Sequence, residues 1–423
     1  MTNEKIRLNL IMNLGGIFVP SIFDLQKRLG HPHNLSTMFH FAQKKMQIKL
    51  PVGERTLRKP EISLGTAKKI FQPFVPDKIE FGILRKISLV GKIFSNAPGT
   101  WILWESALIG FEQRQPLYSK TVFVIRERCK ADKECIYKVR NAASDLEKKD
   151  IIISTLKKYT WVDPTLIEEG ATSMLDYIEN GKLTSRVLEF VVAMYVDFYF
   201  MLFSSFEAEC VELAQQKQYS FIRIGFLADL MPIERKDIMI GPMERLFDYW
   251  QKILSEEKGS KVSWTDMAQA MPAPTKSSRK LNQKASTLQK SNYRMLCQWR
   301  KAKHIPSDGK LRLFIANLHL PNDDEIWFWQ AKIAMFLNSI YKEPEIQMAH
   351  KTFLLKTFAQ YSTYSEKTLA RFADPEFHSA RQKKDLYHDE VSQPIKTSSL
   401  YLNYKIIQKI KLNTNTLTNG ISE

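Results

Sequence analysis

Hydrophobic residues recur at helical spacing through most of the chain after residue 125. The segment from Leu146 to Lys158 sets apolar residues against Glu and Lys, and the segment from Met243 to Leu254 is amphipathic. Apolar residues three and four positions apart share one face of a helix, which can then pack against other helices. The pattern therefore predicts a helical domain over residues 126–258.

One stretch, from Val187 to Phe206, is apolar on nearly every side. A bilayer span needs about twenty mostly apolar residues, and this stretch has that length. However, Asp197 lies near its centre, where a carboxylate would be costly in lipid. We predict a buried central helix in which Asp197 is paired with a basic group or exposed at a seam, and no membrane partner.

The first 125 residues show a different pattern, in which Pro and Gly interrupt short segments. Two apolar runs, Thr100 to Trp104 and Thr121 to Ile125, are rich in β-branched and aromatic residues, which favour strands. We predict a hairpin in which the two runs pair across the turn at Gln113 to Pro116. Near the other end of the chain, Ala349 to Phe372 and Leu400 to Leu412 have helical spacing.

A more specific pattern lies in a basic segment near residue 300. Leu296 precedes Trp299 by three residues, Pro306 follows Trp299 by seven, and Leu311 follows Pro306 by five. Leu296 and Trp299 share one helix face, so they can pack inward while the opposite face stays free. Pro306 suits the start of a helix. That helix carries an apolar stripe that we predict to lie over Trp299, formed by Leu311, Phe314, Ile315 and Leu318.

These spacings resemble those of Xre-type, lambda-repressor-like helix-turn-helix domains, over residues 262–320 of this chain. Val262 to Ala268 resembles the second helix of such domains, and Ser263 with Asp266 has the spacing of a capping box. Two positions depart from the family pattern. The residue after the Trp is usually acidic and is Arg300 here, and the usual Gly three after the Trp is Ala302.

The connection between the two helices is also longer than in the family. Pro272 to Lys290 inserts roughly nineteen residues, and loops of that length are usually functional or disordered. We predict a flexible basic arm that follows DNA phosphates, with contacts from Lys276 and Arg279.

Taken together, these patterns divide the chain into four regions: an α+β region at 1–125, a helical domain at 126–258, a helix-turn-helix domain at 259–345 with the insertion 272–290, and a helical C-terminal region with a disordered tail at 346–423. The expected fold class is mainly α and multidomain.

Charge supports nucleic-acid binding by this segment. Between Lys258 and Leu320, thirteen Lys and Arg residues stand against two Asp residues, in a chain whose net charge is +17. Such a local excess of positive charge is the electrostatic signature of a nucleic-acid surface. The expected partner is double-stranded DNA.

The resemblance assigns a role to each polar residue of the expected recognition helix, which would be capped by Ser291 and Asn292. Base edges in the major groove would be met by Asn292, Tyr293, Arg294 and Gln298. Phosphates would be met by Arg300, Lys301 and Lys303, together with Lys276 and Arg279. Domains of this kind commonly bind paired half-sites as symmetric dimers, so we expect a homodimer formed through the larger helical region.

Catalytic motifs are scarce. The sequence has no Gly-rich phosphate loop, HExxH, GxSxG elbow or Cys/His cluster with zinc spacing. No catalytic residue, metal site or cofactor is therefore predicted, and a role other than an enzyme is favoured. His31, His33 and His40 are close in sequence, but we expect them to be solvated loop residues.

Two nuclease signals stay open as alternatives. The Arg-x6-His form of HEPN-family ribonucleases occurs three times, at Arg312 and His319, Arg371 and His378, and Arg381 and His388. Asp77, followed by Glu147 and Lys149, has the residue types of a metal-dependent PD-(D/E)xK nuclease, with poor spacing.

Three classes of function follow. The first is a DNA-binding protein: a transcriptional regulator, or a DNA-targeting component of a mobile element or phage-defence system. The second is an endoribonuclease that uses Arg371 and His378. The third is a non-catalytic assembly subunit, in which the aromatics Trp327 to Trp329 and the Val187 to Phe206 helix form a protein interface.

The expected location is the cytoplasm. The four cysteines, Cys129, Cys135, Cys210 and Cys297, show no CxxC spacing. Free thiols fit a reducing compartment. The N-terminus also lacks a clean signal-peptide core.

Overall fold

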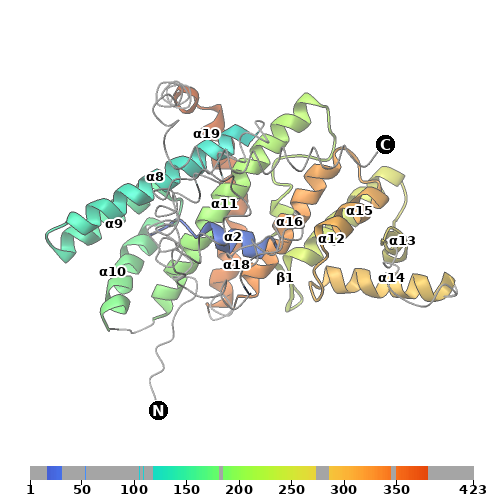
Figure 1. Cartoon of the computed structure of the whole chain (residues 1–423), viewed down its shortest axis with the longest axis horizontal. Helices are drawn as coiled ribbons and strands as arrows, with labels where there is room; N and C mark the ends of the chain where they lie inside the picture. The colour runs from blue at the N-terminus through green and yellow to red at the C-terminus, as the bar shows by residue number, and fades with distance from the viewer. Residues whose placement is uncertain are drawn as a thin grey trace, which may run out of the picture. The chain divides into compact units, whose positions relative to one another are not determined.

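The computed structural model describes residues 17–30, 53, 104, 108, 118–180, 184–272, 285–343 and 349–379 (Figure 1). Of the residues it describes, 74% are helical, and the sheet found among them is a single pair of short strands. The predicted mainly α fold class is therefore confirmed. The predicted turn at Gln113 to Pro116, the histidines at 31, 33 and 40, and the last predicted helix at 400–412 lie outside the described residues.

The chain forms two compact units, each described here by itself. The first comprises residues 1–10 and 156–371, and the second comprises residues 11–155 and 372–423. The first unit includes most of the predicted helical domain, all of the predicted helix-turn-helix domain and the start of the C-terminal region. The division into four regions stays a prediction.

The described elements of the first unit follow one another as ten helices or helical turns and one hairpin. They are α10 (Pro164–Asn180), α11 (Ser185–Gln216), η4 (Ala228–Leu230), β1 (Ile233–Arg235), β2 (Ile238–Ile240), α12 (Pro242–Lys258), α13 (Trp264–Gln269), α14 (Ala285–Arg300), α15 (Asp308–Leu318), α16 (Asp324–Tyr341), α18 (Lys351–Ala359) and α19 (Tyr361–Ala373). The strands β1 and β2 pair in antiparallel register, with Glu234 opposite Met239. α19 extends two residues past the end of this unit.

The described helices of the second unit are α2 (Ile22–Arg28), α8 (Ser119–Asn141) and most of α9 (Asp145–Tyr159). The predicted strand Thr121 to Ile125 was wrong, because these residues form the start of α8. All five are buried. A short apolar run buried on every side gives no periodicity that separates strand from helix, so tertiary packing overrides the β preference of its Val and Ile residues. Of the partner run Thr100 to Trp104, the structure describes only Trp104, which is helical.

Asp132 anchors the second unit. It is fully buried on α8, and its Oδ1 accepts hydrogen bonds from the backbone N–H groups of Ile17 (2.8 Å) and Phe18 (3.0 Å). A buried carboxylate is stable where several donors satisfy it. Its contacts therefore fix the segment before α2 against α8.

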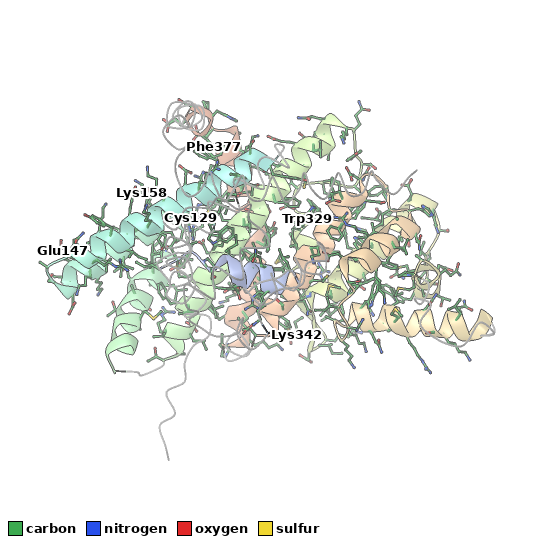
Figure 2. The ribbon with its side chains drawn as sticks, viewed as in Figure 1. Cys129, Glu147, Lys158, Trp329, Lys342 and Phe377 are labelled. Carbon is green, nitrogen blue, oxygen red and sulfur yellow. The ribbon has the colours of Figure 1, made fainter. Side chains whose placement is uncertain are left out.

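Glu147, considered above as a nuclease carboxylate, has a local structural contact at the start of α9 (Figure 2). Its Oε2 accepts from the backbone N–H of Ala143 at 2.7 Å, and its own N–H donates to Ser144 Oγ at 3.2 Å. Side chains that exchange hydrogen bonds with the backbone in this way satisfy the free donors at a helix start. The pair Glu147 and Lys149 thus belongs to a capped helix start, while Asp77 lies outside the described residues.

The long helix α11 is the core of the first unit. Among the described residues it is the one helix long and apolar enough to cross a bilayer, but 89% of its most apolar window is buried. Asp197 is 1% exposed and accepts hydrogen bonds from Tyr364 Oη (2.6 Å) and the Trp161 backbone N–H (2.8 Å). The predicted buried helix is confirmed. The expected exposed seam is wrong, because Asp197 is buried and accepts from these two uncharged donors.

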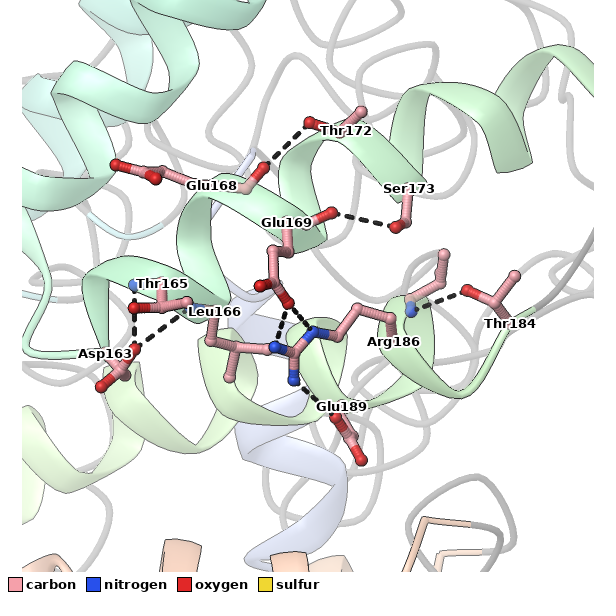
Figure 3. A network of polar contacts seen from close by, with 11 residues as sticks. Asp163, Thr165, Leu166, Glu168, Glu169, Thr172, Ser173, Thr184, Arg186 and Glu189 are labelled. Carbon is pink, nitrogen blue, oxygen red and sulfur yellow. Dashed lines mark hydrogen bonds and ion pairs between the residues drawn. The ribbon is translucent and has the colours of Figure 1, made fainter.

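The start of α11 is fixed against α10 by polar contacts on the surface (Figure 3). Thr184 Oγ1 caps α11 by accepting from the Val187 N–H at 3.2 Å. Arg186 Nε donates to Glu169 on α10 at 2.6 Å, and its Nη1 donates to Glu189 at 3.0 Å. These contacts hold the two helices in an antiparallel hairpin.

A second buried carboxylate, Glu207 on α11, lies in the same unit. It is 1% exposed and accepts hydrogen bonds from the Leu227 N–H at 3.0 Å, from Tyr361 Oη at 3.2 Å and from the Ser365 hydroxyl. Burial nevertheless raises the pKa of Glu207 from 4.5 to about 6, against the lowering effect of these donors.

This pKa gives a testable pH dependence. The folded protein binds the Glu207 proton more tightly than the unfolded chain does, so the stabilisation by this group is complete below pH 4.5 and is lost as the pH rises through about 6. Between about pH 4 and about pH 7.5, wild type is expected to lose about 2 kcal/mol of unfolding free energy relative to Glu207→Gln. Urea unfolding of both proteins at the two pH values measures this change. A difference that stays constant with pH would contradict it.

Candidate nucleic-acid interface

Five helices of the first unit, α12 to α16, pack around a shared aromatic core. α12 contacts α14 and α16, α13 contacts α14, and α15 contacts α16. Trp250 of α12, Trp299 of α14 and Phe314 of α15 are each 0% exposed. The rings of Trp299 and Phe314 meet edge to face, with centroids 5.5 Å apart. This is the predicted cover of Trp299, and the predicted apolar stripe of α15 is confirmed, since all four of its residues are buried.

The helix α13 starts as the sequence predicts. Ser263 Oγ accepts from the Asp266 N–H at 3.2 Å, and Asp266 Oδ2 accepts from the Ser263 N–H at 2.8 Å. These hydrogen bonds with Ser263 lower the pKa of Asp266, whose charged form they favour. The predicted capping box is confirmed, and it fixes the start of α13 immediately before its contact with α14.

The start of α14 differs from the prediction. The helix begins at Ala285, so Ser291 and Asn292 lie inside it and do not cap it. Ser and Asn are favoured at helix caps but cost only a modest amount inside a helix, and the sequence from Ala285 to Arg300 contains no Gly or Pro that would break the helix. The end of the predicted insertion is therefore helical. Lys276 and Arg279 lie outside the described residues.

One face of α14 is anchored and the opposite face is free. Leu296 and Trp299 mark the inner face, with 1% and 0% of their surface exposed. At 3.6 residues per turn Asn292 lies on this inner side, one turn earlier, and it is half-buried. Asn292 therefore does not share the free face, contrary to the prediction. The free face carries four exposed polar side chains, those of Lys290, Arg294, Gln298 and Lys301.

Two other predicted residues, Tyr293 and Lys303, border this free face, and so does Cys297. Tyr293 is 40% exposed. Lys303 is exposed just after the helix, and Cys297 between Arg294 and Lys301 is half-exposed. The structure thus brings Tyr293, Arg294, Gln298, Lys301 and Lys303 together on one side of α14 or at its end. All four cysteines are free thiols, as predicted.

Arg300 has a different position from the one predicted. Its Nη2 forms an ion pair with Asp248 of α12 at 2.9 Å, and its guanidinium lies 4.5 Å from the centre of the Trp264 ring of α13. Its side chain is 29% exposed. The prediction that Arg300 contacts phosphate is corrected, because this cation joins α14 to both neighbouring helices.

Ala302, just after the end of α14, has a left-handed backbone conformation. Ala302 has a positive φ of 47°, a left-handed conformation that Gly adopts at no steric cost. The Ala302 N–H donates to the Trp299 carbonyl at 2.9 Å, and the Lys303 N–H donates to the Gln298 carbonyl at 2.9 Å. These two bonds make a Schellman motif, in which the left-handed residue ends the helix.

Replacing Ala302 with Gly is therefore expected to stabilise the fold. Gly removes the steric cost of the left-handed conformation, about 1–2 kcal/mol. It also loses more conformational entropy on folding than Ala does, which costs about 0.5–1 kcal/mol. The expected net gain in unfolding free energy is about 0.5–1 kcal/mol, measured by urea unfolding. The matched control Ala316→Gly, at an exposed residue with helical backbone in the last turn of α15, should lose up to about 1 kcal/mol. A loss at position 302 would show that this end of α14 is not left-handed.

The predicted helix start near Pro306 is confirmed. α15 begins at Asp308 and has Ser307 at its N-cap position, so Pro306 lies immediately before the cap. Pro306 is buried. Asp308 pairs with Lys332 of α16 at 2.8 Å, which ties the start of α15 to the next helix.

The residues of the alternative functions have other contacts. Arg312 pairs with Glu325 and lies 3.6 Å from the centre of the Phe328 ring. Arg371 and His378 are not on one continuous helix, because Asp374 separates two helical segments. Trp327 is fully buried, and its Nε1 donates to the Pro321 carbonyl at 2.6 Å, as expected for an aromatic residue of the core. Arg381 and His388 lie outside the described residues.

The sequence prediction missed Lys290 as a site residue. It lies one helical turn before Arg294, and a helix starting at Asn292 left it in the insertion. The signal that could have found it was the unbroken helical sequence before Ser291.

Comparisons of the chain with protein families, with curated proteins and with solved structures found no match.

Proposed function

We propose that this protein binds double-stranded DNA by placing α14 in the major groove, as the recognition helix of an Xre-like helix-turn-helix. The observation that carries the proposal is the two-sided character of α14. Leu296 and Trp299 hold one face in the core, while Lys290, Arg294, Gln298 and Lys301 are exposed on the opposite face. A helix fixed on one side and lined with cations on the other suits the width and charge of the major groove.

The charge around α14 supports the proposal. From Met267 to Ser307 the sequence contains no Asp or Glu. The one described cation of α14 that has an acidic partner, Arg300, takes it from α12 and lies toward the core. The remaining cations attract phosphates without competition from nearby carboxylates.

The residues of the free face have separate roles in this proposal. Arg294 and Gln298, in the middle of the face, contact base edges. Lys290, Lys301 and Lys303, toward the two ends, contact phosphates, which sets the register and orientation on the duplex but carries no sequence information. Lys276 and Arg279 precede α14 and extend the phosphate contacts.

Binding across a salt series tests the proposal. Fluorescence anisotropy with mixed-sequence duplex DNA, single-stranded DNA and RNA distinguishes the nucleic acids, and the slope of log affinity against log salt counts the phosphates contacted. Tightest binding is expected for the duplex, with a steep salt dependence. Absence of binding to the duplex at low salt would exclude the proposal, and cleavage of RNA lost on His378→Ala would favour the endoribonuclease alternative.

The wider role is proposed on the same basis. We place the protein in the cytoplasm, as a transcriptional regulator or a DNA-targeting component of a mobile element or phage-defence system, acting as a homodimer on paired half-sites. Sedimentation with and without DNA tests the dimer. A single monomeric species in both conditions would exclude it.

A further inference from the structure

We infer that the DNA site of this protein contains a guanine and an adenine one or two base steps apart, read from the major groove by Arg294 and Gln298. This inference rests on the proposed function and adds the chemical identity of the bases to it. It comes from the position, spacing and hydrogen-bonding groups of the two side chains.

The position of these residues makes both available to a base pair. Arg294 and Gln298 are exposed and lie on the side of α14 opposite Leu296 and Trp299. They are four residues apart, so they are neighbours on the helix surface. By contrast Asn292 and Arg300, which carry similar groups, are half-buried toward the core. The middle of the free face therefore presents one guanidinium and one amide.

The chemistry of each group selects a base. A guanidinium is a planar donor that forms two hydrogen bonds with the O6 and N7 acceptors of guanine. A primary amide carries a donor and an acceptor, which match the N7 acceptor and the N6 donor of adenine. α14 contains no Asp or Glu that would accept from the cytosine amino group. The helix therefore reads purines.

The spacing sets how far apart the purines lie. Four residues of α-helix rise about 6 Å along the axis. Base pairs rise about 3.4 Å per step along the duplex axis, so two side chains about 6 Å apart reach bases one or two steps apart. Lys290 and Lys301, one turn outside this pair on either side, are placed to contact the phosphates that flank it.

Selection from a pool of random duplexes, followed by sequencing, tests the inference with the full-length protein. The enriched sites are expected to share guanine and adenine at this separation. Replacing either base pair should weaken binding by roughly 5-fold to 150-fold. The variant Arg294→Ala should lose the preference at the guanine position alone, and Gln298→Ala should lose it at the adenine position alone.

A change of specificity provides a sharper result than a loss. Gln298→Glu replaces the amide with a carboxylate of the same shape, which accepts from the cytosine amino group, so the preference at this position should change from adenine to cytosine. Lys252→Ala, in an exposed part of α12, serves as the control that keeps the wild-type site. Duplex binding without any base preference, or with a preference that neither variant changes, would overturn this inference and leave the proposed function standing. Failure to bind any duplex would overturn both.

Discussion

Replacing Trp299 with Ala is expected to lower the unfolding free energy by about 3–5 kcal/mol, the range found for large aromatic side chains in protein cores. Trp299 is 0% exposed, and it packs edge to face on Phe314 under α15. The surrounding helices are joined to one another by other contacts, so they cannot close the cavity that the truncation leaves. Urea unfolding followed by far-UV circular dichroism measures the loss without relying on the fluorescence of the removed indole.

Two further variants show whether the loss comes from the core. The Trp299 Nε1 is buried and has no hydrogen-bond partner among the described residues. Trp299→Phe therefore removes an unsatisfied donor together with part of the ring, and it should cost less than half as much as the Ala variant. Leu313→Ala removes an apolar side chain of α15 that is 50% exposed, and its effect should stay within about 0.5 kcal/mol. A loss at Trp299 no larger than that at Leu313 would contradict the position of α14 described above.

The second large effect concerns binding, and it follows from the proposed function. Lys290→Ala combined with Lys301→Ala is expected to reduce the steepness of log affinity against log salt by about 2, since each phosphate contact contributes about 0.9. At physiological salt this corresponds to an affinity loss on the order of 30-fold for duplex DNA. Both side chains are exposed, so the unfolding free energy should change by less than about 0.5 kcal/mol.

Arg300 provides the matched contrast. Because it pairs with Asp248 and lies over Trp264, Arg300→Met should lower the unfolding free energy by about 1–2 kcal/mol. It should leave the salt slope unchanged, since no phosphate contact is removed. Lys252→Ala should change neither quantity. If Arg300→Met reduced the salt slope while the double variant Lys290→Ala, Lys301→Ala kept the wild-type slope, the assignment of the two faces of α14 would have to be reversed.

The features that the sequence alone determined are those set by spacing along one helix. Leu296, Trp299 and the apolar stripe of α15 are buried because residues three or four apart share a face, whatever surrounds the helix. The capping box of Ser263 and Asp266 is equally local, since it joins residues three apart. For the same reason the burial of α11 could be predicted from its continuous apolar surface.

The tertiary structure decided what depends on partners distant in the sequence. Arg300 belongs to a basic run and resembled a phosphate contact, but its anionic partner lies 52 residues earlier. The donors to Asp197 lie 36 and 167 residues away, so no local pattern indicated them. Thr121 to Ile125 is helical and buried on every side, so its sequence lacks the alternation that would separate a strand from a helix. Hydrophobic spacing acts within one turn of a helix, whereas a charge, a buried carboxylate or a fully buried segment takes its role from whatever the fold brings next to it.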